Sequence, residues 1–150
     1  MSYHTIDELQ NFSFQNAYIE NIEFRGGELT MILDQVTILS TNSKNRDIRP
    51  MRTNDFHLVI QQADITAFVE EGYKLYDADG NLKEQKEDLS LSPESYGAAF
   101  TSLLGCTIYE IVQENNCYTI SIDTEDHTFL LQITGSHNTQ SWERFFNFDA

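Results

Sequence analysis

Apolar and polar side chains alternate along residues 107–134, and this alternation constrains the fold more than any other feature of the sequence. Successive side chains of a β-strand point to opposite faces of its sheet, so the pattern indicates strands with one buried face. Asn115 and Asn116 tolerate positive φ and favour a tight turn, and residues 124–127 favour a second turn. The sequence therefore predicts a three-stranded antiparallel meander.

The turn at Asn115 and Asn116 also sets the register of this meander. It pairs Ile111 with Ile120, and two residues further along it pairs Tyr109 with Ile122. A slip of one residue in any strand would turn its apolar side chains to the solvent, so the register is strongly specified. The apolar side chains expected on the buried face are Tyr109, Ile111, Tyr118, Ile120, Ile122, Phe129, Leu131 and Ile133.

Two further segments show the same period. Alternation on both sides of Gly26-Gly27 predicts a hairpin, and its second strand is expected to extend through residues 36–38. Residues 56–69 alternate in two opposite phases, and the change of phase at Gln61-Gln62 predicts a β-bulge. Residues 73–83 contain an Asp-Gly pair and predict another hairpin.

One helix is expected at residues 93–104. Ser92 is a good N-cap, Pro93 suits the first helical position, and Gly105 suits the position just after the helix. Apolar residues between these signals have the spacing of a buried helical stripe. Thr5 and Glu8 form a capping-box pattern, which predicts a shorter helix at residues 5–11.

These elements predict a single domain spanning residues 1–150, because the length is that of one ordinary domain. The predicted class is α+β and mostly β. We expect an antiparallel sheet of about seven or eight strands, as a sandwich or a partly closed barrel, with one main helix near residues 93–104.

The charge of the chain limits the classes of molecule that it is expected to bind. Its formal net charge is −15, from 24 acidic and 9 basic side chains. Nucleic acid and anionic membranes require clustered Lys and Arg, so we expect neither as a partner and expect a basic protein instead. The oligomeric state is left open by these data.

The start of the chain has neither the basic nor the apolar region of a secretory signal. Two cysteines, Cys106 and Cys117, do not make a disulfide framework. We therefore expect free thiols and a cytoplasmic location.

Motifs that would indicate chemistry are missing from the sequence. The four histidines, at positions 4, 57, 127 and 137, have no neighbours at metal-ligand spacing. The acidic segment before Gly80 lacks the ligand positions of a calcium loop, and neither a phosphate loop nor a nucleophile elbow occurs. We therefore expect no catalytic residues, no metal and no cofactor.

Acidic residues gather at the second turn of the meander. Asp123, Glu125 and Asp126 lie there, either as a solvated turn or as part of a partner-binding surface. Trp142 belongs to an aromatic-rich tail over residues 140–148, whose aromatic spacing fits one face of a helix or of a strand. The tail either closes the core or forms an exposed interface, in which case Trp142 joins the partner-binding residues.

The basic residues cluster only in the irregular segment 41–54. Lys44, Arg46, Arg49 and Arg52 lie there, within a strongly acidic chain. Either this loop folds onto the acidic surface of the protein itself, or it binds an anion or a partner.

Three functions follow from these expectations. The first is a non-catalytic protein-binding module, and its most concrete form is a cytosolic inhibitor of the immunity type that neutralises a basic toxin or nuclease. The second is a small-ligand carrier or sensor that uses the mouth or interior of a β-barrel. The third is an enzyme whose catalytic groups come together from distant turns.

Overall fold

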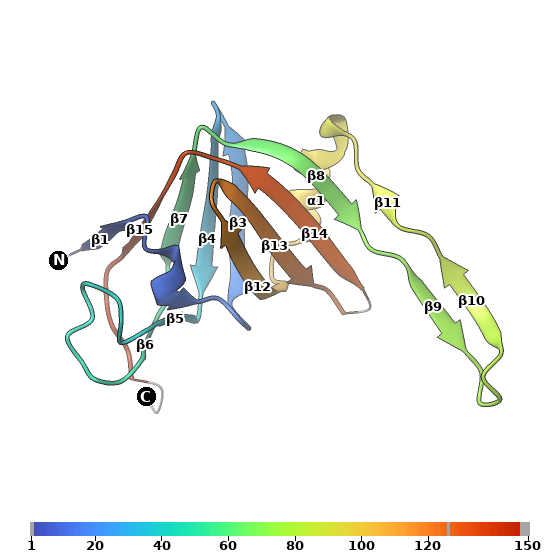
Figure 1. Cartoon of the computed structure of the whole chain (residues 1–150), viewed down its shortest axis with the longest axis horizontal. Coiled ribbons are helices and arrows are strands. Elements are labelled where there is room, and N and C mark those ends of the chain that lie inside the picture. Colours follow the sequence, from blue (N-terminus) through green and yellow to red (C-terminus); the bar gives the residue numbers. More distant parts are fainter. Residues whose placement is uncertain (1, 126, 148–150) are drawn as a thin grey trace.

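The computed structural model describes residues 2–125 and 127–147, and its largest part is one antiparallel sheet (Figure 1). The sheet has ten strands and is not closed. The order across it is β1 (Tyr3–Ile6), β15 (His137–Trp142), β7 (Phe56–Gln61), β4 (Glu28–Asp34), β3 (Tyr18–Arg25), β12 (Thr107–Glu114), β13 (Cys117–Asp123), β14 (Thr128–Thr134), β8 (Asp64–Glu70) and β11 (Leu89–Ser90). The mostly-β antiparallel class with one short helix is confirmed, in the form of a sandwich with more strands than expected.

Two sharp corners fold this sheet into its two layers. One corner joins β7 to β8, and Gln62 adopts φ +50° there. The other joins β14 to β15 through Gly135, where a Cβ would lie 2.4 Å from the Ile60 Cγ2 atom. The change of phase at Gln61-Gln62 is therefore not a bulge within one strand, because the chain leaves one layer and enters the other at this point.

The smaller elements surround the sandwich. Strands β2 (Phe12–Ser13), β5 (Val36–Ile38) and β6 (Met51–Thr53) form a separate sheet, because Gln35 at φ +59° ends β4 before residue 36. The expected extension of β4 is therefore wrong. Strands β9 (Tyr73–Tyr76) and β10 (Leu82–Lys86) form the predicted hairpin, which projects from the body as an arm (Figure 1).

The expected main helix is present as a 3₁₀ turn, η2 (Pro93–Ser95), followed by α1 (Tyr96–Ser102). The helix expected at residues 5–11 is reduced to a 3₁₀ turn, η1 (Leu9–Asn11). Thr5 lies in β1, and its hydroxyl donates to the Gln140 side chain instead of capping a helix. Among the described residues, no helix is long and apolar enough to cross a membrane.

The predicted meander is confirmed, with one correction. Ile120 lies opposite Ile111 on one side and Leu131 on the other, as expected. A bulge between residues 108 and 110 shifts the far end of β12, so Ile108, not Tyr109, lies opposite Ile122. Ile108 is therefore 0% exposed and Tyr109 52% exposed.

The two layers are joined by buried polar contacts as well as by apolar packing. The Asn138 side-chain amide in β15 donates to the Tyr118 hydroxyl in β13 (2.9 Å). The Gln140 amide donates to the Asn138 side-chain oxygen, and the Gln140 oxygen accepts from Thr5 (2.7 Å). Because buried polar groups are costly without partners, this chain of hydrogen bonds favours a single alignment of the layers.

The bulge in β12 can be tested by a matched pair of substitutions. Ile108→Ala should lower the free energy of unfolding by ~2–5 kcal/mol, because it leaves a cavity in the core. Tyr109→Ala should lower it by less than about 1 kcal/mol, because the ring lies at the surface. Urea denaturation of both variants provides the measurement, and a larger loss for Tyr109→Ala would contradict the observed register.

Candidate functional site

Among the described residues, β3 has a neighbouring strand along one edge but backbone partners only at one end of the other edge. On the β12 side the register consists of Tyr18 opposite Thr107. The Ile19 amide donates to the Cys106 carbonyl (2.9 Å), and the Gly105 amide donates to the Ile19 carbonyl (2.8 Å). The segment that pairs with the start of β3 turns away from it at Gly105, which adopts φ +84°. Beside the rest of β3, α1 lies where a neighbouring strand would otherwise be.

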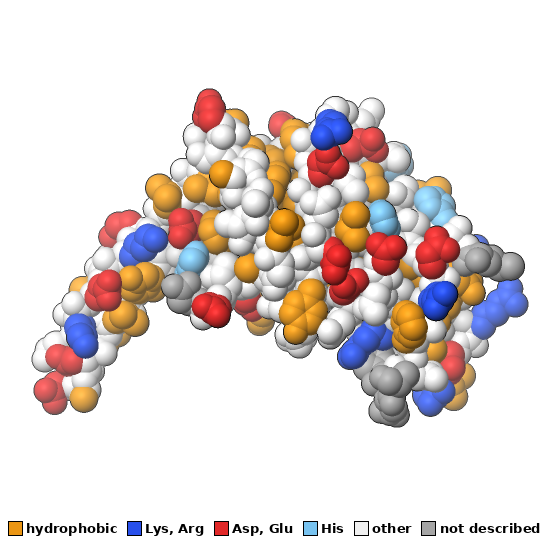
Figure 2. Space-filling model, turned by 180° about the vertical axis from the view of Figure 1, so that it is seen from behind, with side chains coloured by type: hydrophobic (Ala, Val, Ile, Leu, Met, Phe, Trp, Pro, Cys, Tyr) orange, Lys and Arg blue, Asp and Glu red, His pale blue; other side chains and the backbone are white. Residues whose placement is uncertain are grey.

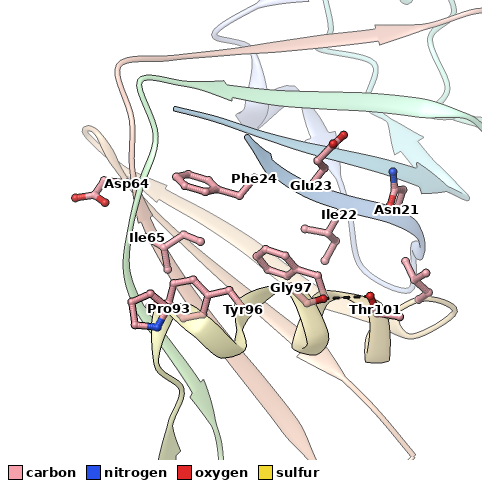
Figure 3. Close-up of a pocket in the computed structure, with 12 residues that line it drawn as sticks. Asn21, Ile22, Glu23, Phe24, Asp64, Ile65, Pro93, Tyr96, Gly97 and Thr101 are labelled. Carbon is pink, nitrogen blue, oxygen red and sulfur yellow. Dashed lines mark hydrogen bonds between the residues drawn. The ribbon is translucent and has the colours of Figure 1, made fainter. Parts of the chain in front are cut away.

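A first hollow of about 520 Å³ lies between this part of β3, α1 and the start of β8 (Figure 3). Phe24 and Tyr96 face it from opposite sides, with Ile65 between them (Figure 3). Its lining includes two acidic residues, Glu23 and Asp64, and no basic residue.

A second hollow of about 680 Å³ adjoins the first, and Leu104 lines both. Tyr18, Glu20, Asp34 and Arg52 are among its other lining residues. We call the surface formed by the two hollows the β3 face. Four large apolar side chains on it are between 37% and 45% exposed: Tyr18, Phe24, Leu104 and Phe146. Exposed apolar side chains that gather in this way mark interaction sites.

Like charges meet on the β3 face. The pKa of the Glu20 carboxyl is raised by a hydrogen bond shared with the Asp34 carboxyl, by the negative charge of Asp34 and further by that of Asp55. Asp34 also accepts a hydrogen bond from the Asp55 amide (2.8 Å). Figure 2 shows acidic side chains across the middle of the rear face, while most Lys and Arg side chains of the body lie towards the end opposite the arm. A cation placed beside Glu20 and Asp34 would relieve their repulsion.

The four basic residues of the 41–54 loop do not converge on one site. Lys44 and Arg46 line a third hollow, of about 740 Å³, whereas Arg52 lines the second. Arg49 pairs with Asp47 of the same loop (Nε to Oδ1, 3.5 Å). The structure thus distributes these charges over separate places.

The acidic turn and the aromatic tail are placed differently from each other. Glu125 is exposed and lines a hollow beside α1, Asp123 is half-buried at the end of β13, and Asp126 lies outside the described residues. Trp142 ends strand β15, is 1% exposed and stacks on Phe56 with ring centroids 6.0 Å apart. Trp142 therefore belongs to the core and offers no surface to a partner, so it leaves the set of candidate partner-binding residues.

Two observations concern metal-binding side chains and the Cys106 thiol. They contain no group of three or more side chains that could hold a metal ion. The pKa of the Cys106 thiol is raised by burial and by the charge of Glu125, which keeps the thiol protonated at neutral pH and weakens it as a nucleophile.

The arm exposes apolar side chains of its own. Leu75, Tyr76 and Leu82 are between 47% and 59% exposed. A two-stranded hairpin is marginally stable on its own. The arm is therefore a second candidate contact surface, separate from the β3 face.

Sequence reasoning did not single out the β3 face, although one signal was present. In residues 18–24 the apolar residues follow an irregular spacing, with Ile19 and Ile22 three apart. The structure explains this by a bulge between residues 19 and 21. No protein-family model, curated protein or solved structure matches this chain.

Glu20→Gln should stabilise the protein at pH 7. A raised pKa means that the folded state binds the proton of Glu20 more tightly than the unfolded state does, so the ionised carboxylate lowers stability at neutral pH. The advantage of the variant should fade as the pH falls through the raised pKa and should be gone below the unfolded pKa, near about 4.3. Thermal unfolding of both proteins from pH 3 to 7 is the measurement. A variant with lower stability at pH 7 would contradict the proposed repulsion.

Proposed function

We propose that this chain is a non-catalytic protein-binding module whose β3 face binds a basic partner. The observation that carries the proposal is the second hollow, which the acidic Glu20 and Asp34 line together beside half-exposed Tyr18 and Leu104. Aromatic and apolar anchors next to charged groups are typical of binding surfaces. Lys or Arg side chains of a partner would neutralise the repelling carboxylates that the free protein carries.

The net charge supports the same proposal at longer range. A chain with a charge of −15 attracts a basic protein before contact, which accelerates association and makes it dependent on salt. A basic toxin or nuclease has a surface that suits a polyanion. Carboxylates that lie close together resemble such a polyanion. The most concrete form of the proposal is therefore an inhibitor of the immunity type.

The test is comparative capture from extracts of the native host. Wild-type protein should retain a basic protein that Glu20→Gln/Asp34→Asn retains at least about tenfold less, a difference of roughly 1.4 kcal/mol. The matched control, Glu110→Gln/Glu114→Gln, removes two exposed acids from β12 and should behave as wild type.

Affinity of the purified pair should then fall as the salt concentration rises, since screening weakens steering and attraction between exposed charges. Equal loss of capture in the control variant would show that only total charge matters. If neither variant affects capture, the β3 face is not the binding site for the basic partner.

The first hollow favours a second candidate function, a small-ligand carrier or sensor. Its volume of about 520 Å³ and its aromatic lining fall within the range of ligand sites. Native mass spectrometry of the purified protein would then show a bound small molecule, released by a substitution in the hollow. A single unliganded mass and no hit in a thermal-shift screen would count against this function.

A further inference from the structure

The unpaired edge of β3 has the features of a site for strand addition. On the β12 side, backbone pairing among the described residues ends at Ile19, whereas on the other side β4 pairs with β3 through Arg25. The stretch from residue 20 to residue 25 spans about 20 Å at about 3.3 Å per residue. An exposed strand edge is a template for pairing with another chain.

The space beside this edge suits the side chains of an added strand. The inner side is the first hollow, where Ile22, Phe24 and Ile65 present apolar surface (Figure 3). Glu23 points to the opposite side of β3, away from α1 (Figure 3). Because alternate side chains of a strand point to opposite faces, an added strand would send one set into the hollow and the other towards the side of Glu23, which pairs with Arg25 (2.7 Å).

We infer that an extended segment of the basic partner adds to β3 as a further strand. This inference rests on the proposed function and specifies how the partner is recognised. The segment has about five or six residues that alternate between apolar and basic. Backbone hydrogen bonds to β3 provide affinity, and the hollow and the carboxylates select the sequence.

Charge complementarity favours a foreign segment over a second copy of this chain. The first hollow is lined by two acidic and no basic residues, and each copy carries a charge of −15. The arm is the segment by which a second copy could reach the hollow, since its strand β9 contains Lys74 between apolar residues. Residues 73–86 nevertheless hold as many acids as lysines, three Lys against Asp77, Asp79 and Glu84.

Gly97 offers a way to close the hollow without disturbing the fold. It lies in α1, lines the hollow, and a Cβ added to it would meet no atom within 4 Å. Gly97→Phe should place a ring in the hollow and leave the helix intact. Gly97→Ala is the matched control, because it improves helix propensity and adds only one methyl group.

The probe is a synthetic, dye-labelled hexapeptide of alternating Arg and Val, capped at both ends, measured by fluorescence anisotropy. Wild type and Gly97→Ala should bind it alike, and Gly97→Phe at least about tenfold more weakly, or roughly 1.4 kcal/mol. The same peptide with its alternate amides N-methylated should also bind wild type at least about tenfold more weakly, since it cannot donate along one edge. An Arg-Ser hexapeptide of equal charge controls for attraction without apolar contact.

Equal binding of the methylated and unmethylated peptides would overturn strand addition, as would equal binding by Gly97→Phe and wild type. Sedimentation showing that the wild-type protein dimerises, with Gly97→Phe monomeric, would assign the hollow to a second copy and also overturn it. The native partner separates the two proposals. If its capture depends on Glu20 and Asp34 but not on Gly97, the proposed function stands and strand addition fails.

Discussion

The site depends on the early end of pairing between β3 and β12. Gly105 turns the chain out of α1 directly beside Ile19, so β12 runs away from the rest of β3 and a short helix lies where another strand would fit. A helix cannot form hydrogen bonds with the backbone N–H and C=O groups along a strand edge as a neighbouring strand does. The result is a sheet that stays open at one place, with an apolar hollow next to unpaired backbone.

The acidic residues Glu20 and Asp34 are a second feature of the site that does not stabilise the fold. Proteins usually separate like charges or pair them with opposite ones, yet Glu20 and Asp34 line the same hollow, where hydrogen bonding to Asp34 and its negative charge raise the pKa of the Glu20 carboxyl. Binding surfaces often carry such costs, because a group that is unfavourable in the free protein becomes favourable in the complex. The β3 face therefore combines three features that stability alone does not require: an open edge, exposed apolar side chains and repelling carboxylates.

Much of the fold could be predicted because its signals are local. The meander, the hairpin at Gly26-Gly27 and the helix after Ser92 follow from alternation, turn residues and caps within short windows. The errors occur where one residue changes the path of the chain. The bulge that buries Ile108 shifts the pattern by one position without an obvious marker in the sequence. The corner at Gln62 is marked by a change of phase, but a bulge within one strand would give the same change.

The site was less predictable because it is assembled from distant segments. Tyr18 and Leu104 are far apart in sequence, and only the fold brings them to the same hollow. The residues that the sequence did favour are separated instead, since Trp142 enters the core and Arg49 pairs within its own loop. The expectation of a basic partner rests on net charge, which carries no information on where a partner binds.

Hydrogen exchange of this chain, alone and with the basic partner that we propose, tests the central claim most directly. Amide exchange reports backbone protection region by region. The account predicts that residues 18–25 and 104–105 become protected in the complex, while residues 44–52 and the arm at 73–86 exchange as in the free protein. Protection confined to the arm or to the 44–52 loop, with β3 unchanged, would contradict it.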